Sequence, residues 1–376
     1  MIPIAKPHID AAEAQAAYDT ILTGWITQGP RVQEFEEKFA AYTGSQYAVA
    51  VSNCTTGLHL ALLVGGIGAG DEVICPSMSY IATANSIVYC GAEPVFAEID
   101  PLTYNLDIND VRQRITPKTK AILLVHQIGM PADIDGFAAL ARQHNLLLIE
   151  DAACAAGSAY KGKKIGSHSD LVCFSFHPRK VISTGDGGMV TTNNEAFAKR
   201  MKLLRQHGMS ISDRARHGTS KVVFEDHLEV AYNYRLTDIQ AAVGIQQLAK
   251  LDSIVEGRRH IAQRYAQLLG DIDCIRLPRE PEGCFTNWQS YSIYLLPNAP
   301  IERNELMQRM LDNGVASRRG IMTSHRETAY TSRNGITSLP VTEDACDRSI
   351  IIPLFVPMSN AEIDTVASVF RKCLFG

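Results

Sequence analysis

Short apolar runs alternate with amphipathic stretches between about residue 45 and residue 200. The apolar runs are rich in Val, Ile and Leu, and they comprise residues 47–52, 71–76, 94–99, 121–126, 146–151 and 171–176. Several are almost continuously apolar, which is typical of strands that are covered on both faces. The segments between them, such as "TTGLHLALLVGG" and "DIDGFAALARQHN", have helical periodicity. The alternation predicts an α/β domain whose central sheet is mostly parallel and flanked by helices.

Helical patterns also lie on both sides of this block. Residues 10–24 predict a helix that is capped by Asp10, and residues 31–44 predict a second helix. The run from 236 to 270 predicts one helix that is long enough to connect two domains. The periodicity is weaker beyond it, and this remainder predicts a smaller α+β domain. The two predicted domains comprise residues 1–249, which include the N-terminal helical segment, and residues 250–376.

The composition excludes several classes of partner. The chain has 376 residues, which is too many for one compact core, and it is 46% hydrophobic and 20% charged. Its formal net charge of -4 shows no basic excess for nucleic acid or for an anionic membrane surface. No apolar run approaches the roughly 18 residues that span a bilayer, and the first residues do not resemble a signal peptide. We therefore expect a cytoplasmic protein that binds neither nucleic acid nor membrane.

The nine cysteines do not form a pattern that is typical of a disulfide framework or a zinc site. Their spacing is scattered and no CxxC occurs. We expect no bound metal, and we expect most of these side chains to be buried in a reducing compartment.

Two glycine-containing segments resemble phosphate loops but lack the required context. "GSAYKGKK" (157–164) ends in Lys164 where a metal-binding Ser or Thr is needed, and no clear helix follows it. "GGIGAGDE" (65–72) precedes a predicted strand instead of following one. Neither segment predicts a nucleotide site.

Polar and aromatic residues gather where the predicted strands end, which is where open α/β sheets bind ligands. In "SNCTTGLHLAL" a helix begins directly after a strand and offers an anion site, although simple capping by Thr55 or Thr56 explains it equally well. Tyr80 opens the next helix, either as a functional aromatic or as a packed tyrosine. Asp151 ends a very apolar strand, either as a helix cap or opposite a cation. Lys180 follows the strand that ends in "FSF" and precedes three glycines.

Taken together, these features match the needs of one cofactor. A phosphate needs an anion site, a flat ring needs an aromatic face, a protonated pyridine nitrogen needs a carboxylate, and an aldehyde needs a lysine. Pyridoxal 5'-phosphate (PLP) has all four groups. The segment around Lys180 therefore predicts a lysine that performs chemistry, although an ordinary loop lysine is the commoner case.

The chain also resembles the DegT/DnrJ/EryC1/StrS family of sugar aminotransferases, which have the aspartate aminotransferase fold (PLP fold type I). The resemblance covers most of the chain and becomes weaker after about residue 250. The segments that carry it are "GWITQGPRVQEFEEKFA", "SNCTTGLHLAL", "DEVICPSMSYIATANSI", "GAEPVFAEID", "VHQIGMPADIDG", "IEDAACAAGS", "FSFHPRKVISTGDGGMV" and "AYNYRLTDIQAAVG".

The resemblance implies a role for each matching residue. Lys180 would bind the cofactor aldehyde and later move a proton as a general base and acid, and Asp151 would pair with the pyridine nitrogen. The remaining implied cofactor contacts are Cys54, Thr55, Tyr80, Cys154, Ser175 and Asn233. Asn233 would reach the phosphate of the partner subunit, which implies a homodimer with shared active sites. Cys154 departs from the family pattern, where Gln or His is usual, and Cys54 replaces a common glycine.

The implied reaction moves an amino group from an amino acid, with L-glutamate as the expected donor, to a ketosugar on a nucleotide. It places the protein in aminosugar biosynthesis, such as that of lipopolysaccharide or other polysaccharides. For the acceptor we expect a wide cleft between the domains, lined by "SRRGIMTSHRETAY" with Arg318, Arg319, His325, Arg326 and Tyr330. The alternative is that these are solvated charges on an ordinary loop. A keto-cyclitol acceptor and a non-catalytic homologue that binds PLP also stay open.

Overall fold

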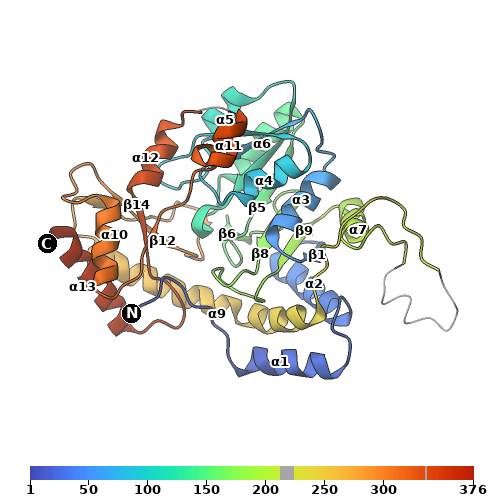
Figure 1. Cartoon of the computed structure of the whole chain (residues 1–376), viewed down its shortest axis with the longest axis horizontal. Helices are drawn as coiled ribbons and strands as arrows, with labels where there is room; N and C mark the ends of the chain where they lie inside the picture. Colours follow the sequence, from blue (N-terminus) through green and yellow to red (C-terminus); the bar gives the residue numbers. More distant parts are fainter. Residues whose placement is uncertain (212–223, 335–336) are drawn as a thin grey trace.

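The computed structural model describes residues 1–211, 224–334 and 337–376, and its largest element is a seven-stranded sheet (Figure 1). The order of the strands across this sheet is β1 (Tyr47–Val51), β9 (Gly188–Thr192), β8 (Leu171–Ser175), β5 (Leu147–Asp151), β4 (Thr119–Val125), β2 (Glu72–Pro76) and β3 (Glu93–Ala97). β9 runs antiparallel to β1 and β8, whereas the pairs from β8 to β3 are parallel. The predicted mostly parallel sheet is therefore confirmed. The antiparallel β9 was not among the predicted strands.

Helices cover both faces of this sheet because successive strand residues point to opposite sides. Leu123 and Ile149 face one core, and Leu124 and Leu148 face the other. The first face is covered by α3 (Cys54–Val64), α4 (Ala82–Tyr89) and α7 (Glu195–Leu204). The second is covered by α2 (Pro30–Thr43), α5 (Ile108–Arg114), α6 (Ile134–His144) and the first half of α9 (Asp238–Leu269).

Two helices outside the large sheet agree closely with the helices predicted from the sequence. α1 (Ala11–Leu22) packs along α9 and begins with a capping box, in which Asp10 accepts from the Ala12 N–H and the Glu13 side chain accepts from the Asp10 N–H. The predicted cap at Asp10 is thus confirmed. α9 has 32 residues and is capped by Thr237.

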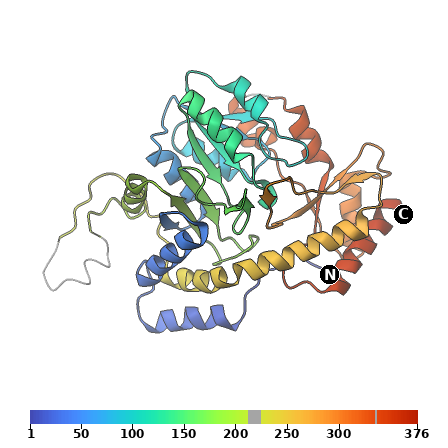
Figure 2. The same ribbon diagram turned by 180° about the vertical axis from the view of Figure 1, so that it is seen from behind.

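α9 belongs to two hydrophobic cores. Its side chains from Ala241 to Val255 pack against the large sheet, and those from Ile261 to Leu269 pack into the core of the smaller sheet. Figure 2 shows the helix running across the molecule from one part to the other. The predicted helix between two domains is therefore present, and the boundary between residues 249 and 250 stays a prediction.

The C-terminal region forms an antiparallel four-stranded sheet in the order β10 (Ile275–Arg276), β12 (Tyr291–Leu295), β14 (Ser349–Ile352) and β13 (Arg318–Arg319). α10 (Arg303–Asp312) and α13 (Asn360–Phe375) pack against it, which gives the predicted α+β arrangement. Two further helices, α11 (Thr328–Asn334) and α12 (Pro340–Arg348), lie over the large domain instead, because Tyr330 and Leu339 enter its core. Both chain termini lie beside the smaller sheet (Figure 1).

A third sheet contains β6 (Ala159–Tyr160), β7 (Lys163–Lys164) and β11 (Cys284–Phe285). β6 and β7 form a hairpin whose two turn residues, Lys161 and Gly162, have φ values of 47° and 79°. Positive φ at both positions is typical of the tight turn that joins such strands. "GSAYKGKK" is therefore a hairpin, in agreement with its rejection as a phosphate loop. Among the described helices, none combines the length and the apolar character that crossing a membrane requires.

Side chains occupy the free edge of β1, the outermost strand of the large sheet. The Ala50 N–H donates to Glu36 at 3.0 Å, and Arg205 donates to the Ala50 carbonyl at 2.6 Å. Arg205 also donates to Glu36 at 2.5 Å. Burial opposes the charge on Glu36, but the cations of Arg205 and Lys202 outweigh it and lower the pKa of Glu36. The buried ion pair thus binds backbone groups that another strand would otherwise pair with.

Candidate active site

Lys180 lies in the loop between β8 and β9, at the carboxyl end of the parallel strands. The loop is held by backbone hydrogen bonds from Phe176 to Gly187 and from Thr184 to Phe176. Its glycines Gly185 and Gly187 have φ values of 85° and 156°, which confirms that the backbone there needs glycine. The Lys180 side chain is half-buried and reaches the residues that follow β5.

The amine of Lys180 lies 3.2 Å from the sulfur of Cys154, which follows β5. Asp151, the last residue of β5, is within electrostatic range of the same amine. Burial alone would lower the pKa of Lys180. The neighbouring Cys154 and Asp151 have the larger effect, and the pKa of Lys180 is raised. The structure therefore brings together the predicted lysine, the predicted acid and the unusual cysteine.

Asp151 is buried, with 5% of its surface exposed, and its carboxylate accepts two hydrogen bonds. The Thr83 hydroxyl donates at 2.8 Å and the Ala153 N–H donates at 3.1 Å. Burial raises the pKa of Asp151, against the lowering effect of these two donors. Because Thr83 has one hydroxyl proton and gives it to Asp151, the hydroxyl of Ser79, 2.7 Å away, must donate to Thr83.

Sequence reasoning missed Thr83 as a residue of this site. It stands in the first turn of α4, three residues after Tyr80, where its sequence context is that of an ordinary helix residue. The neighbouring acid, Glu150, lies on the opposite face of β5 and pairs with His126 at 2.7 Å. Strand alternation thus separates two adjacent acids, and only Asp151 faces the lysine.

An anion cradle forms where β1, β9 and β8 lie side by side. Gly188 pairs with Val51 on one side and with Ser175 on the other. A Cβ at Gly188 would lie 2.6 Å from the carbonyl carbon of Asn53, so only glycine allows this close approach. Asn53 caps α3, whose first residue is Cys54.

The cradle has the donors that a phosphate requires. The N–H groups of Cys54 and Thr55 lie in the first turn of α3, where no preceding helical carbonyl can accept them. The N-terminal end of a helix dipole attracts negative charge. The Ser175 hydroxyl lies at the end of β8 next to Gly188. The alternative of capping by Thr55 or Thr56 is wrong, because the N-cap is Asn53 and the Thr56 hydroxyl forms only the reciprocal half of the capping box.

Tyr80 and Asn233 both have exposed side chains in the single chain. Tyr80 is 66% exposed and directly precedes the N-cap of α4. Asn233 lies between Tyr232 and Tyr234, whose rings stack with centroids 4.9 Å apart, and its backbone pairs with Gln206. The stacked pair holds the segment against the large domain and leaves the asparagine facing outward.

The structure corrects the placement of His325 and Tyr330, which were expected to line the acceptor cleft. His325 is 3% exposed, and its ring bonds to Ser77 at 2.5 Å and to Glu343 at 3.1 Å. Tyr330 is also 3% exposed, and its hydroxyl donates to Asn85 at 2.8 Å. Both side chains pack into the body of the large domain, so they have no free surface for a diphosphate or a sugar ring.

His325 instead ties the C-terminal region to the loop that carries Tyr80. The Ser324 N–H donates to the Ser77 carbonyl at 2.8 Å, and the His325 N–H donates to the Ser77 hydroxyl at 3.1 Å. Residues 323 and 78 form a β-bridge beside these bonds. The loop from Ser77 to Thr83 is thus held by the C-terminal region at one end and by Asp151 at the other.

The predicted arginines differ in their surroundings. Arg326 pairs with Asp347 at 2.9 Å, and Arg319 lies 3.7 Å from Glu327. Arg318 lies near Arg179, the residue before Lys180.

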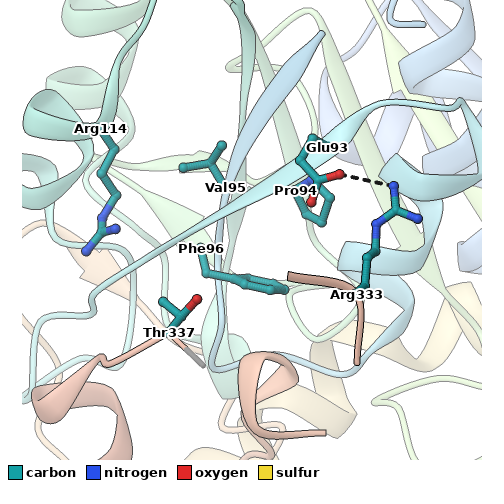
Figure 3. A pocket seen from close by; sticks show the side chains of 7 residues that line it. All are labelled: Glu93, Pro94, Val95, Phe96, Arg114, Arg333 and Thr337. Atoms are coloured by element: carbon teal, nitrogen blue, oxygen red, sulfur yellow. Dashed lines mark hydrogen bonds and ion pairs between the residues drawn. The ribbon is translucent and has the colours of Figure 1, made fainter. Parts of the chain in front are cut away.

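Two larger hollows lie away from these residues. The first, of about 1130 Å³, lies between the domains beside Asp100–Asn109 and Arg276–Glu282. The second, of about 590 Å³, lies at the edge strand β3, where Arg333 pairs with Glu93 (Figure 3). Among the described residues, the linings of both hollows include none of the predicted site residues. The acceptor cleft expected between the domains therefore stays a prediction, because neither hollow contains a residue that was predicted to line it.

A family model described as the DegT/DnrJ/EryC1/StrS aminotransferase family matches residues 7–371. The chain belongs to this family. It is 35% identical over 374 residues to an uncharacterised protein of Methanocaldococcus jannaschii, covering 99% of this chain and 97% of that one. It is 33% identical to the aminotransferase TlmJ of Streptoalloteichus hindustanus, with a TM-score of 0.91 and coverage of 100% and 99%.

A third relative bears on the cofactor. The putative sugar aminotransferase Spr1654 of Streptococcus pneumoniae has been solved in a PMP form and a PLP form. The PMP form is 29% identical to this chain, with a TM-score of 0.94 and coverage of 99% of both chains. This family is PLP-dependent, so the protein is an aminotransferase that uses PLP.

The residues of this chain fit that cofactor. Gly188 lets β9 approach the backbone of Asn53 and Cys54 closely, which brings Ser175 and the first turn of α3 to the same end of the sheet, where a phosphate would find donors. Asp151 is a carboxylate whose pKa is raised by burial, and a pyridinium beside it would supply an opposite charge. The amine of Lys180 is within electrostatic range of both Asp151 and Cys54. The individual contacts to the cofactor remain predictions.

Proposed function

We propose that this aminotransferase moves an amino group from L-glutamate to a ketosugar carried on a nucleotide, with a role in aminosugar and polysaccharide biosynthesis. The observation that carries the proposal is the convergence of Lys180, Asp151 and the Gly188 cradle at one edge of the sheet. The similarity to a putative sugar aminotransferase supports a sugar as acceptor.

The proposed mechanism assigns the following tasks to the residues of the site. Bound PLP supplies an electron sink for the bond that breaks at the substrate carbon. Asp151 keeps a proton on the pyridine nitrogen, and Thr83 and the Ala153 N–H keep Asp151 in place. Lys180 would bind the aldehyde group of the cofactor, and its amine would also serve as the general base and acid for the proton at the substrate carbon. Ser175 and the first turn of α3 hold the phosphate.

We further propose that the active enzyme is a homodimer with shared active sites. Asn233 is exposed on a segment that stacked tyrosines hold outward, which suits a contact with a second subunit. The exposed Tyr80 ring suits the same arrangement, because it would be covered by cofactor and partner. Cys154 lies beside Lys180 and would contact the cofactor from the side of β5.

The experiment has two stages. The holoenzyme is reduced with borohydride and digested, and mass spectrometry should find the cofactor on the peptide that contains Lys180. Labelling of Lys161, Lys163 or Lys164 instead would show that the assignment is wrong. The two half-reactions are then followed by the cofactor spectrum, first with glutamate and next with a panel of nucleotide-ketosugars and keto-cyclitols. Absence of pyridoxamine formation with every amino acid would favour a non-catalytic PLP-binding protein.

A further inference from the structure

The loop between β11 and β12 (residues 286–290) holds the turn that carries Cys154. The side chain of the buried Asn287 donates to the carbonyls of Cys154 and Ala156, both at 2.8 Å. Its amide oxygen accepts from the Gln289 N–H at 2.9 Å. Both amide hydrogens and the amide oxygen are thus used, and these partners fix which way the amide faces.

The same loop also holds the segment that carries Lys180. The Gln289 side chain donates to the Arg179 carbonyl at 2.9 Å, and Arg179 directly precedes Lys180. Cys154 and Lys180 follow different strands of the large sheet, and their sulfur and amine lie 3.2 Å apart. The 286–290 loop therefore bonds to the backbone on both sides of this contact.

Asn287 fits closely against the segment that follows β4. A Cβ at Gly129 would lie 1.9 Å from the amide oxygen of Asn287, so only glycine allows this approach. The Asn287 N–H donates to the Ser158 hydroxyl at 3.1 Å, and this hydroxyl donates to the Gly129 carbonyl at 2.7 Å. These contacts leave Asn287 little freedom, and the Cys154 carbonyl is held with it.

A buried arginine fixes the 286–290 loop from below. Arg258 of α9 is 5% exposed, and it donates to the carbonyls of Trp288 at 2.9 Å and Gln289 at 2.5 Å. It also donates to the Leu354 carbonyl at 3.2 Å, and burial lowers the pKa of Arg258 to about 10. Trp288 has a φ of 50°, a conformation that a residue other than glycine keeps only where its surroundings impose it. The loop is therefore a rigid support.

We propose that the 286–290 loop is a clamp that sets the position of Lys180 for its bond with the cofactor, with Asn287 and Gln289 as positioning residues. The inference rests on the role of Lys180 in the proposed function. Lys180 and Cys154 stand on separate loops, so the distance between them depends on what joins these loops. One rigid support that bonds to both keeps the amine oriented toward the cofactor aldehyde, which lowers the entropy that the reaction must lose.

The test follows the absorption of the PLP-loaded enzyme. Gln289→Met keeps the length of the side chain and removes its donor. Loss of one neutral hydrogen bond weakens an interaction about 2- to 10-fold, so PLP should leave this variant faster by that factor. The pH midpoint of the absorption change should fall by about 0.3 to 1 pH unit, because the lysine nitrogen moves away from Cys154 and Asp151, which favour a positive charge on it.

Gln308→Met is the matched control. Gln308 is an exposed glutamine on α10 whose amide bonds to Asp312 of the same helix, so the same substitution there should change neither quantity. Asn287→Ala should shift both quantities further than Gln289→Met, because two carbonyls lose their donor. Gln289 lies at the surface end of the clamp, so its variant keeps the proposal testable if Asn287→Ala does not fold.

Two outcomes would overturn the clamp. One is an unchanged midpoint with unchanged PLP release in Gln289→Met. The other is a lower melting temperature of both clamp variants with an unchanged midpoint, which would show that the loop only stabilises the fold. Borohydride labelling of a lysine other than Lys180 would refute the proposed function and the clamp together. Labelling at Lys180 with an unchanged midpoint would refute the clamp alone.

Discussion

Replacing Thr83 with Val should slow transamination without changing the fold. The substitution removes one hydroxyl and keeps the size and shape of the side chain. Thr83 supplies one of the two hydrogen bonds that the buried Asp151 carboxylate accepts, at 2.8 Å. Its hydroxyl in turn accepts a hydrogen bond from Ser79. Without the hydroxyl, the pKa of Asp151 should rise further, because a buried carboxylate loses a donor that stabilised its charge.

The magnitude follows from the type of hydrogen bond. A hydrogen bond to a charged group contributes about 1.5 to 3 kcal/mol, and each 1.4 kcal/mol is a factor of ten in rate. Asp151 is buried, so solvent does not screen the loss. If Asp151 holds the pyridinium in both half-reactions, each should slow about 10- to 100-fold. The effect should be smaller than that of Asp151→Asn, which removes the charge itself.

The assay is a single-turnover measurement of the cofactor spectrum with glutamate and, separately, with the ketosugar acceptor. Thr83→Ser retains a hydroxyl and should recover most of the rate. Ser86→Ala is the matched control, because Ser86 lies on the same helix and donates to the Thr83 carbonyl without touching the acid. Rates of Thr83→Val within twofold of wild type would refute the reasoning. So would an equal loss in Ser86→Ala, since it would point to the packing of α4 instead of the acid.

Three further predictions concern the buried pair, the interdomain tie and the dimer. Glu36 has a lowered pKa in the folded state, so its stabilising contribution is present above its unfolded pKa and is lost as the pH falls. The free energy of unfolding, measured with denaturant from neutral to acidic pH, should therefore fall less steeply in Glu36→Gln than in wild type. An unchanged slope would argue against this. His325→Gln should lower the melting temperature and impair both half-reactions to a similar degree, whereas a loss confined to the ketosugar would return His325 to the acceptor site. Coexpressed Lys180→Ala and Asn233→Ala subunits should regain activity, because one site of the mixed dimer carries neither change; inactive heterodimers would contradict shared sites.

The local elements could be predicted because each depends on residues close together in the chain. The strands β1 to β5 and β8 follow the predicted apolar runs within a few residues, since burial on both faces demands continuous Val, Ile and Leu. The capping box at Asp10 and the beginning of α9 at Thr237 likewise depend on side chains three residues apart. The anion site, Tyr80, Asp151 and Lys180 at the strand ends together predicted PLP as the cofactor, which the family confirms, and the roles of the single residues stay predictions.

The strand β9 could not be placed in the same way. Its apolar residues were visible, but nothing local distinguishes a parallel strand from an antiparallel one. Its position between β1 and β8 depends on the tight loop after Lys180, and it is this placement that sets Gly188 against Asn53 and creates the cradle.

The roles of single side chains depended on contacts far apart in the sequence. His325 looks like a surface ligand in the sequence, yet it bonds to Ser77, 248 residues earlier, and is buried. Thr83 gains its role only because α4 lies beside the end of β5, and Arg179 meets Arg318 only because the smaller sheet packs against the lysine loop. Periodicity along a chain reports whether a residue is buried, because that depends on its own element. Which partner it meets depends on the path of the whole chain, and only the tertiary structure decides it.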